Sequence, residues 1–231
     1  MLPSAQVSSE TETRAITCRG GKRGLLFVLP LAGLFSSAAS ILSYSVGSYS
    51  WLLPGFVFGL FICGSFAVLN LLVTIRRVLG LMVVTTVAYP VSILLAGGIQ
   101  LVLPWRHWSM GDRSDISAVT LCAAGFVGAF LVIEGTLLLV PALTEKGSLL
   151  AKTLCWSLLG GVLAVIGWKL GPSLGMRLWH MAHALHLTAP DETAVNATGD
   201  TSHQFSLWFV WQTGMGVVLA KNCRLKEVKQ A

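Results

Sequence analysis

Residues 118 to 143 read AVTLCAAGFVGAFLVIEGTLLLVPAL, and Glu134 is the only charged side chain in this stretch. An α-helix needs about 20 predominantly apolar residues to cross the hydrocarbon core of a bilayer. The stretch exceeds that length, so it predicts a transmembrane helix that carries one carboxyl group inside the membrane.

The rest of the chain shares this apolar character. Its 231 residues are 54% hydrophobic and 11% charged, with a mean hydropathy of +0.74, whereas soluble domains carry about 25% charged residues. With five further apolar runs, the predicted spans cover residues 24–44, 51–75, 78–104, 118–143, 153–170 and 205–220. The sequence therefore predicts an all-α, polytopic integral membrane protein whose single domain, residues 24–220, is a six-helix transmembrane bundle.

Lysine and arginine residues indicate the orientation of these spans, because they accumulate in short cytoplasmic segments. With a cytoplasmic N-terminus, only four of the 16 basic residues lie outside, namely Arg106, Arg113, Lys169 and Arg177. We therefore expect cytoplasmic tails at residues 1–23 and 221–231, in a protein of the cell membrane. The basic residues occur at the ends of apolar runs rather than along one soluble face, which argues against a nucleic-acid partner.

The longest predicted external segment, residues 171–204, begins with GPSLGMRLWHMAHALHLTAP. Its apolar residues recur at helical spacing, at Leu174, Leu178, Met181 and Leu185. This pattern predicts a short helix that lies flat at the outer membrane interface between spans five and six. The same segment contains a glycosylation sequon at Asn196, which matters only in a host that glycosylates proteins.

Three histidines, His180, His183 and His186, fall on the opposite face of this predicted helix. Histidines three residues apart can share a metal ion, with Asp191 or Glu192 completing the site, and a pH-sensing face is the other functional interpretation. The pattern lacks the i, i+4 histidine pair and the glutamate of H-E-x-x-H. We therefore expect no metal site and interpret the histidines as the polar face of the interfacial helix.

Seven of the eight tryptophans fall near the predicted outer interface, where an indole can bury its ring and keep its N–H hydrated. The sequence therefore predicts a one-sided aromatic belt, and an aromatic-lined entrance for a substrate is the alternative. These seven are Trp51, Trp105, Trp108, Trp168, Trp179, Trp208 and Trp211.

Glu134 belongs to a small set of polar residues at membrane depth. It lies about 5 Å to the cytoplasmic side of the centre of its span, at 1.5 Å per residue. Tyr89 and Gln212 lie near the centres of their own spans, and Asn70 lies about 10 Å closer to the cytoplasm. The four residues predict a polar cluster inside the bundle.

Three interpretations of this cluster remain open, because a central charge costs about 2.5–3.5 kcal/mol unless it is neutralised, paired or hydrated. Glu134 is the carboxylate of a proton or cation relay in the first. In the second, a protonated Glu134 links helices through a hydrogen bond to Tyr89 or Asn70. In the third, its side chain extends toward Arg76 or Arg77 at the inner interface.

The chain contains no catalytic signature, since G-x-S-x-G, H-E-x-x-H, a Walker loop and a dinucleotide-binding glycine motif are all missing from the sequence. We therefore expect neither an enzyme nor a cofactor. The preferred function is a small permease that moves an ion or small solute, with Glu134 as the coupling carboxylate. The alternative is a non-catalytic interaction protein or accessory subunit in the lipid bilayer, which forms homo- or hetero-oligomers through small-residue helix faces.

Overall fold

The computed structural model describes residues 21–44, 52–71, 74–102, 117–140, 143, 149–184 and 198–222. Every regular element within these residues is helical, which confirms the predicted all-α class. The elements are α1 (Gly21–Tyr44), α2 (Leu53–Val68), α3 (Ile75–Val102), α4 (Ala118–Leu139), α5 (Leu149–Lys169), the π-helix η3 (Gly171–Gly175), α6 (Met176–Ala184) and α7 (Thr198–Asn222).

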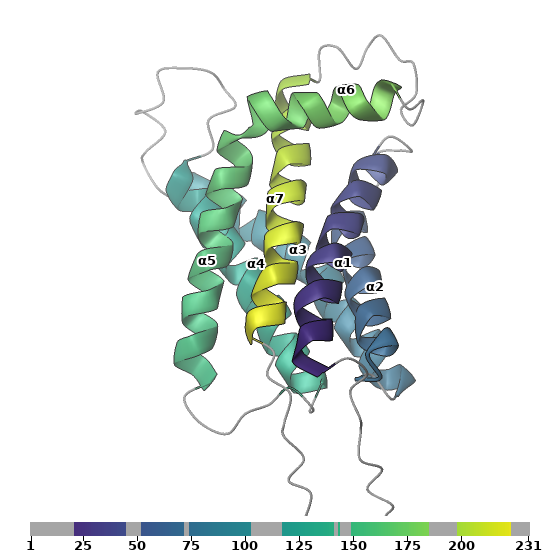
Figure 1. The fold of residues 1–231 in the computed structure, drawn as a ribbon. Helices are drawn as coiled ribbons and strands as arrows, with labels where there is room; N and C mark the ends of the chain where they lie inside the picture. The colour runs from purple at the N-terminus through teal and green to yellow at the C-terminus, as the bar shows by residue number, and fades with distance from the viewer. Residues whose placement is uncertain are drawn as a thin grey trace, which may run out of the picture.

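Six of these helices form a closed ring (Figure 1). Each of α1 to α5 packs against the next helix in the sequence, and α7 packs against both α5 and α1 to close the ring. The helix α6 runs across one end, while α1 begins and α7 ends at the opposite end (Figure 1). We call these the α6 end and the termini end of the bundle.

Among the described residues, four helices are long and apolar enough to cross a membrane, at Arg23–Ile41, Ile75–Ile99, Ala118–Leu139 and Leu150–Lys169. The apolar helix α2 is shorter, with 16 residues. The helix α7 has 25 residues but begins with the polar sequence TGDTSHQ. The sequence predicts six spans. The two that are not among the four candidate spans are α2, which is short, and α7, which begins with polar residues.

The second predicted span, residues 51–75, ends early in the structure, because α2 stops at Val68. Asn70 adopts a left-handed backbone with φ of 56°, and its N–H donates to the Ala67 carbonyl at 3.0 Å. The Leu71 N–H donates to the Phe66 carbonyl at 2.8 Å. This pair of hydrogen bonds is the Schellman motif that ends many helices, and an apolar run does not reveal it.

The ends of α4 and α7 have equally local causes. Ser117 caps α4, since its Oγ accepts a hydrogen bond from the Thr120 N–H at 3.1 Å, and the helix begins at Ala118 as predicted. It ends at Leu139 rather than at residue 143, because Pro141 has no N–H to continue the helix. The predicted sixth span, 205–220, lengthens to Thr198–Asn222 because the polar residues before it continue the helix.

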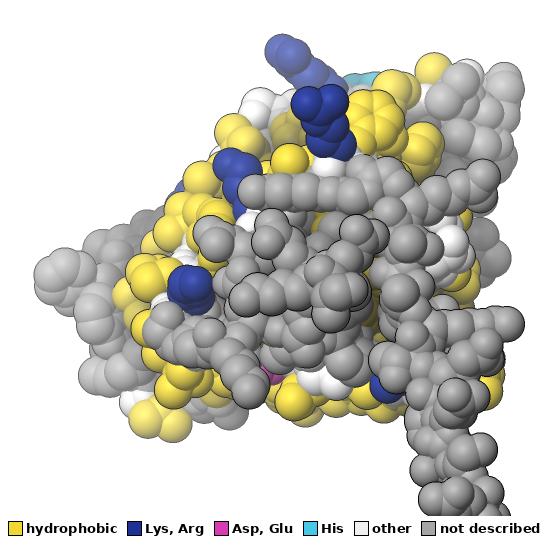
Figure 2. Space-filling model, turned by 60° about the horizontal axis from the view of Figure 1, so that its bottom comes forward, with side chains coloured by type: hydrophobic (Ala, Val, Ile, Leu, Met, Phe, Trp, Pro, Cys, Tyr) yellow, Lys and Arg dark blue, Asp and Glu magenta, His cyan; other side chains and the backbone are white. Residues whose placement is uncertain are grey.

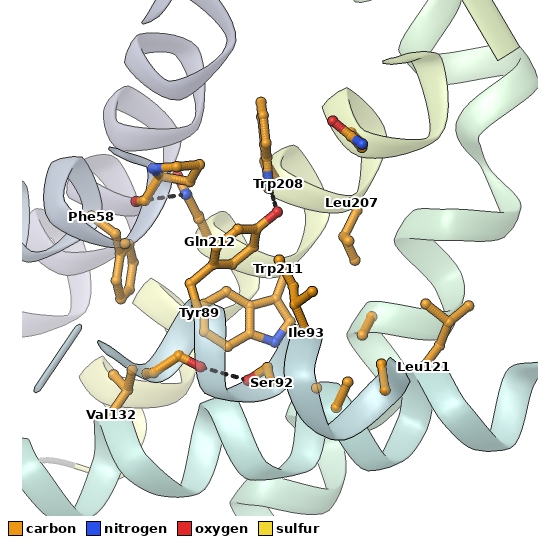
Figure 3. Close-up of a pocket in the computed structure, with 18 of the residues that line it drawn as sticks. Phe58, Tyr89, Ser92, Ile93, Leu121, Val132, Leu207, Trp208, Trp211 and Gln212 are labelled. Carbon is orange, nitrogen blue, oxygen red and sulfur yellow. Dashed lines mark hydrogen bonds between the residues drawn. The ribbon is translucent and has the colours of Figure 1, made fainter. Parts of the chain in front are cut away.

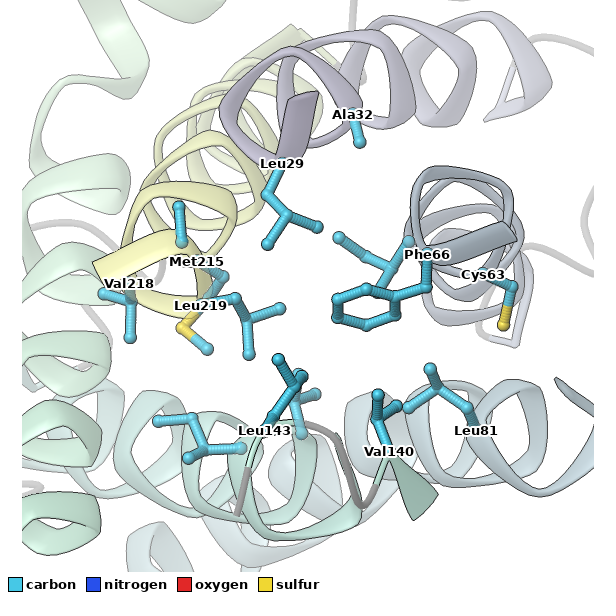
Figure 4. Close-up of a cluster of buried hydrophobic side chains, with 14 of the residues drawn as sticks. Leu29, Ala32, Cys63, Phe66, Leu81, Val140, Leu143, Met215, Val218 and Leu219 are labelled. Atoms are coloured by element: carbon cyan, nitrogen blue, oxygen red, sulfur yellow. The ribbon is translucent and has the colours of Figure 1, made fainter. Parts of the chain in front are cut away.

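Buried apolar side chains fill the termini half of the ring (Figure 4). Leu29 of α1 and Phe66 of α2 are each 0% exposed, and Figure 4 shows both pointing toward the centre of the ring. We call this cluster the apolar plug, and it comprises Leu29, Ile62, Phe66, Leu81, Ile133, Val140, Leu143, Met215, Val218 and Leu219.

Small residues allow the neighbouring helices of the ring to approach closely. A Cβ added to Gly125 of α4 would overlap Ala164 and the Gly160 carbonyl of α5, and one added to Gly216 of α7 would overlap the Leu29 carbonyl of α1. In lipid, such close contact replaces hydrophobic burial as the source of helix association. These small-residue faces are therefore used within the bundle, and they are not free to bind another chain.

The short helix expected in residues 171–204 is present as η3 and α6, and α6 lies across the end of the bundle (Figure 1). Leu178 packs against a buried cluster of Ile41, Phe205 and Trp208, whereas Met181 is exposed. One side of the predicted apolar face thus anchors α6 to α1 and α7.

Basic side chains gather at the termini end, where Figure 2 shows lysine and arginine at the margin of that face. The described ones are Arg23, Arg76, Arg77, Lys152 and Lys221. At the α6 end, the basic side chains in the described ranges are Lys169 and Arg177. The two ends of the bundle therefore differ in charge in the direction that the sequence predicts.

Candidate functional site

The α6 half of the ring contains a cavity of about 300 Å³ between α2, α3, α4, α5 and α7. Each helix contributes residues from the part nearest the α6 end, such as Phe58 of α2, Ile93 of α3 and Leu121 of α4 (Figure 3). Toward the termini end, the ring centre is filled by the apolar plug. The volume lies at the lower limit of ligand sites, which span roughly 300–1,000 Å³.

Five aromatic side chains form much of the cavity wall, namely Phe58, Tyr89, Trp168, Trp208 and Trp211. The rings of Phe58 and Trp211 lie 5.9 Å apart between centroids, and those of Tyr89 and Trp208 lie 6.4 Å apart, edge to face. Aromatic walls give a large apolar contact area with little side-chain freedom to lose on binding.

The predicted aromatic belt is wrong for three of its tryptophans, because Trp168, Trp208 and Trp211 face the inside of the bundle. Trp168 and Trp208 are 7% and 3% exposed, respectively. The alternative interpretation, an aromatic-lined entrance, fits these three residues. Trp51, Trp105 and Trp108 lie outside the described residues, as does the side chain of Trp179.

A hydrogen bond crosses the ring beside the cavity. Trp208 Nε1 of α7 donates to the Tyr89 hydroxyl of α3 at 2.9 Å (Figure 3). The two helices are not neighbours in the ring, so this contact spans its interior. It fixes one aromatic edge of the cavity in place.

Gln212 joins three helices at the base of the cavity. Its Nε2 donates to the Pro54 carbonyl of α2 at 3.2 Å and to Ser40 Oγ of α1 at 3.2 Å, and its Oε1 accepts from Ser36 Oγ of α1 at 2.9 Å. Gln212 is 3% exposed, so these bonds satisfy an amide that would otherwise be costly to bury. Its role is to connect α1, α2 and α7.

The other polar groups of the wall offer few donors to a ligand. Thr85 Oγ1 donates within its own helix to the Leu81 carbonyl at 3.0 Å, and Ser92 Oγ donates to the Ala88 carbonyl at 2.7 Å. Trp211 Nε1 is buried and has no hydrogen-bond partner among the described residues. No charged side chain is among the described residues that line the cavity. The site therefore favours an uncharged, largely apolar ligand.

His203, which the sequence analysis did not single out, supports the α6 end of the cavity. Its Nδ1 donates to the Trp168 carbonyl at 2.6 Å, and its ring stacks on the Trp168 indole with centroids 4.8 Å apart. That carbonyl would normally accept from the residue four positions later, but Pro172 has no N–H. In the sequence, the proline four residues after Trp168 indicates that the Trp168 carbonyl lacks its helical donor and needs another one.

The structure brings two of the four predicted polar residues to one site. Tyr89 and Gln212 both line the cavity, whereas Asn70 ends α2 and Glu134 is not among the lining residues. Glu134 lies nine residues after Gly125, which is two and a half helical turns, so it faces away from the α5 contact. Four residues further on, Leu138 is 77% exposed on the same face.

Within the described residues, Glu134 makes no hydrogen bond or ion pair, so the bonds proposed with Tyr89, Asn70, Arg76 or Arg77 do not form. The three histidines of the predicted polar face lie only partly within the described residues. His180 is exposed, and neither the side chain of His183 nor any part of His186 is described. No group of three metal-binding side chains occurs in the part of the chain that the structure describes.

Comparisons with protein-family models, with curated proteins and with solved structures gave no match for this chain.

Proposed function

We propose that the chain is a six-span membrane protein with both termini in the cytoplasm. The closed ring supports this count, because α2 packs between α1 and α3, α7 packs between α5 and α1, and the helices α1, α3 and α5 are all among the four candidate spans. The basic side chains at the termini end support the orientation. In this orientation, α6 lies at the outer interface and the cavity lies in the outer half of the membrane.

We further propose that the protein is a permease for an uncharged solute with a largely apolar body. The observation that carries this proposal is the one-sided cavity, which is aromatic, uncharged and closed toward the termini end by the apolar plug. A cavity that is closed toward one end of the bundle supports this proposal, because alternating access requires a site that is shut from one side at a time. Glu134 has no place at this site, so coupling through Glu134 is not part of the proposal.

The test compares three probes of similar shape and different charge, namely benzyl alcohol, benzoate and benzylamine. We expect benzyl alcohol to raise the melting temperature of the purified protein and the two charged probes to leave it unchanged. Ala96→Phe, which fills the cavity from α3, should abolish the shift. The matched control, Leu94→Phe, changes a residue of the same helix that is 70% exposed, and it should keep the shift.

Transport is a separate arm of the test. Uptake of the bound probe into proteoliposomes should exceed uptake into protein-free vesicles, and Ala96→Phe should remove the excess. A thermal shift without excess uptake would show that the protein binds the probe but does not transport it, and would reject the permease. Equal shifts with all three probes would reject the uncharged site.

A second proposal, an accessory subunit of a membrane complex, is favoured by Glu134. A charged side chain at this depth costs about 2.5–3.5 kcal/mol, and a polar side chain from a neighbouring helix would reduce that cost. Glu134→Gln should then weaken association of fluorescently labelled copies in vesicles, measured by energy transfer. If the protein acts as the permease alone, the same substitution should leave both association and uptake unchanged.

A further inference from the structure

The wall of the cavity is unusually thin along the last third of α3. Between Pro90 and Ile99 no residue is buried, whereas Leu81, Thr85 and Ala88 earlier in the helix are. A Cβ added to Gly97 or Gly98 would meet no atom within 4 Å. This segment therefore has no closely packed neighbour on its outer side among the described residues.

The inner side of the same segment lines the cavity through Ser92, Ile93 and Ala96. Leu94 is on the other side of the helix and is 70% exposed, because about 100° per residue turns it away from the direction that Ser92, Ile93 and Ala96 share. One helix thus separates the cavity from the surface of the bundle.

Pro90 stands at the start of this segment and lies inside α3. Its missing N–H leaves the Thr86 carbonyl without the usual helical donor, and helices bend most readily at such positions. The segment after Pro90 can therefore move outward with little loss of hydrogen bonding and packing.

We propose that the cavity takes its ligand sideways from the bilayer, past the segment Pro90–Ile99, and that the ligand is a lipid acyl chain. This inference rests on the proposed cavity function and names its solute class. The lining carries no charged side chain, its threonine and serine donors are used within α3, and its volume of about 300 Å³ is at the small end of ligand sites.

The experiment uses the full chain in vesicles of phosphatidylcholine with brominated acyl chains, because bromine quenches indole emission at short range. The emission of Trp211 is obtained as the difference between the protein and its Trp211→Phe variant. We expect brominated lipid to remove most of the Trp211 emission. Ala96→Phe should restore that emission by filling the cavity, and Leu94→Phe should not.

Three outcomes would overturn the inference. If brominated lipid quenches Trp211 equally in the Ala96→Phe variant, the quencher is surrounding lipid and not an occupant of the cavity. If acrylamide in the water quenches Trp211 and brominated lipid does not, the cavity is water-filled, while benzyl alcohol binding can still uphold the proposed function. If neither agent quenches Trp211 and no probe raises the melting temperature, both proposals fail. Melting temperatures of the variants without probe verify folding.

Discussion

The two halves of the bundle are built from the same six helices but differ in what occupies the centre of the ring. In the termini half, apolar side chains from α1, α2, α3, α4 and α7 fill the interior. In the α6 half, aromatic side chains surround an open cavity, and Trp208, Tyr89 and His203 hold its wall by hydrogen bonds. The fold therefore separates a packed cluster from a cavity along the bundle axis.

The two halves of the ring therefore contribute differently to the stability of the bundle. Membrane helices associate through close packing and interhelical hydrogen bonds, since lipid supplies no hydrophobic driving force between them. The plug supplies packing, and Gln212 supplies hydrogen bonds just above it. The cavity wall contributes less packing, so substitutions there should alter ligand binding more than folding.

The largest effect should follow from Phe66→Ala in the plug. Phe66 is 0% exposed, and buried phenylalanine truncations in soluble proteins cost about 3–5 kcal/mol. The transfer from water is missing in a bilayer, so we expect about 3 kcal/mol, measured as the free energy of unfolding in mixed detergent micelles. Phe56→Ala, on the same helix but 42% exposed, is the control, and an equal loss there would contradict a plug that stabilises the fold.

Gln212→Leu should have the next largest effect. It removes hydrogen bonds to Ser36, Ser40 and Pro54, and interhelical hydrogen bonds in membranes average about 0.6 kcal/mol each. We therefore expect a loss of about 2 kcal/mol in the same unfolding assay. Gln204→Leu, at another cavity-lining glutamine of α7, should cost clearly less; similar losses would mean that the amide network is not what joins α1, α2 and α7.

His203→Ala should cost about 1 kcal/mol, the usual value of one net hydrogen bond. The substitution leaves the Trp168 carbonyl without its donor and removes the stacked ring. His203→Gln keeps a side-chain donor and should recover part of the loss. A melting-temperature series of the two variants checks this, and identical values would show that the hydrogen bond contributes nothing.

The smallest effect should come from Ile93→Ala in the cavity wall. Ile93 already borders open space, so its truncation enlarges a cavity instead of creating one, and we expect less than about 0.5 kcal/mol. Ile62→Ala in the plug, where the side chain is 0% exposed, should cost about 2 kcal/mol. If the two isoleucine substitutions lowered the free energy of unfolding equally, the plug and the cavity wall would not differ in packing.

The sequence predicts the helical class and the approximate helix positions, because lipid leaves a spanning backbone few alternatives to the helix. It also identifies Gln212 and Tyr89 as polar residues inside the bundle, and both line the cavity. It does not predict that Glu134 lies away from the cavity, since that depends on which faces of α4 meet α3 and α5. The end of α2 at Asn70 depends on one left-handed residue, and hydropathy is insensitive to backbone conformation.

The contact between α7 and α1 can form only after α7 has been synthesised, so the ring closes late in the synthesis of the helices. The helices α1 and α2 emerge first, yet the hydrogen bonds that join Ser36 and the Pro54 carbonyl to Gln212 can form only once α7 is made. A ribosome synthesises N-terminal segments before C-terminal ones. The hydrogen bonds to Gln212 therefore form only after α3, α4 and α5 have been made. Insertion of the final helix therefore completes the seal and the site in one step, and a nascent chain that lacks α7 has neither.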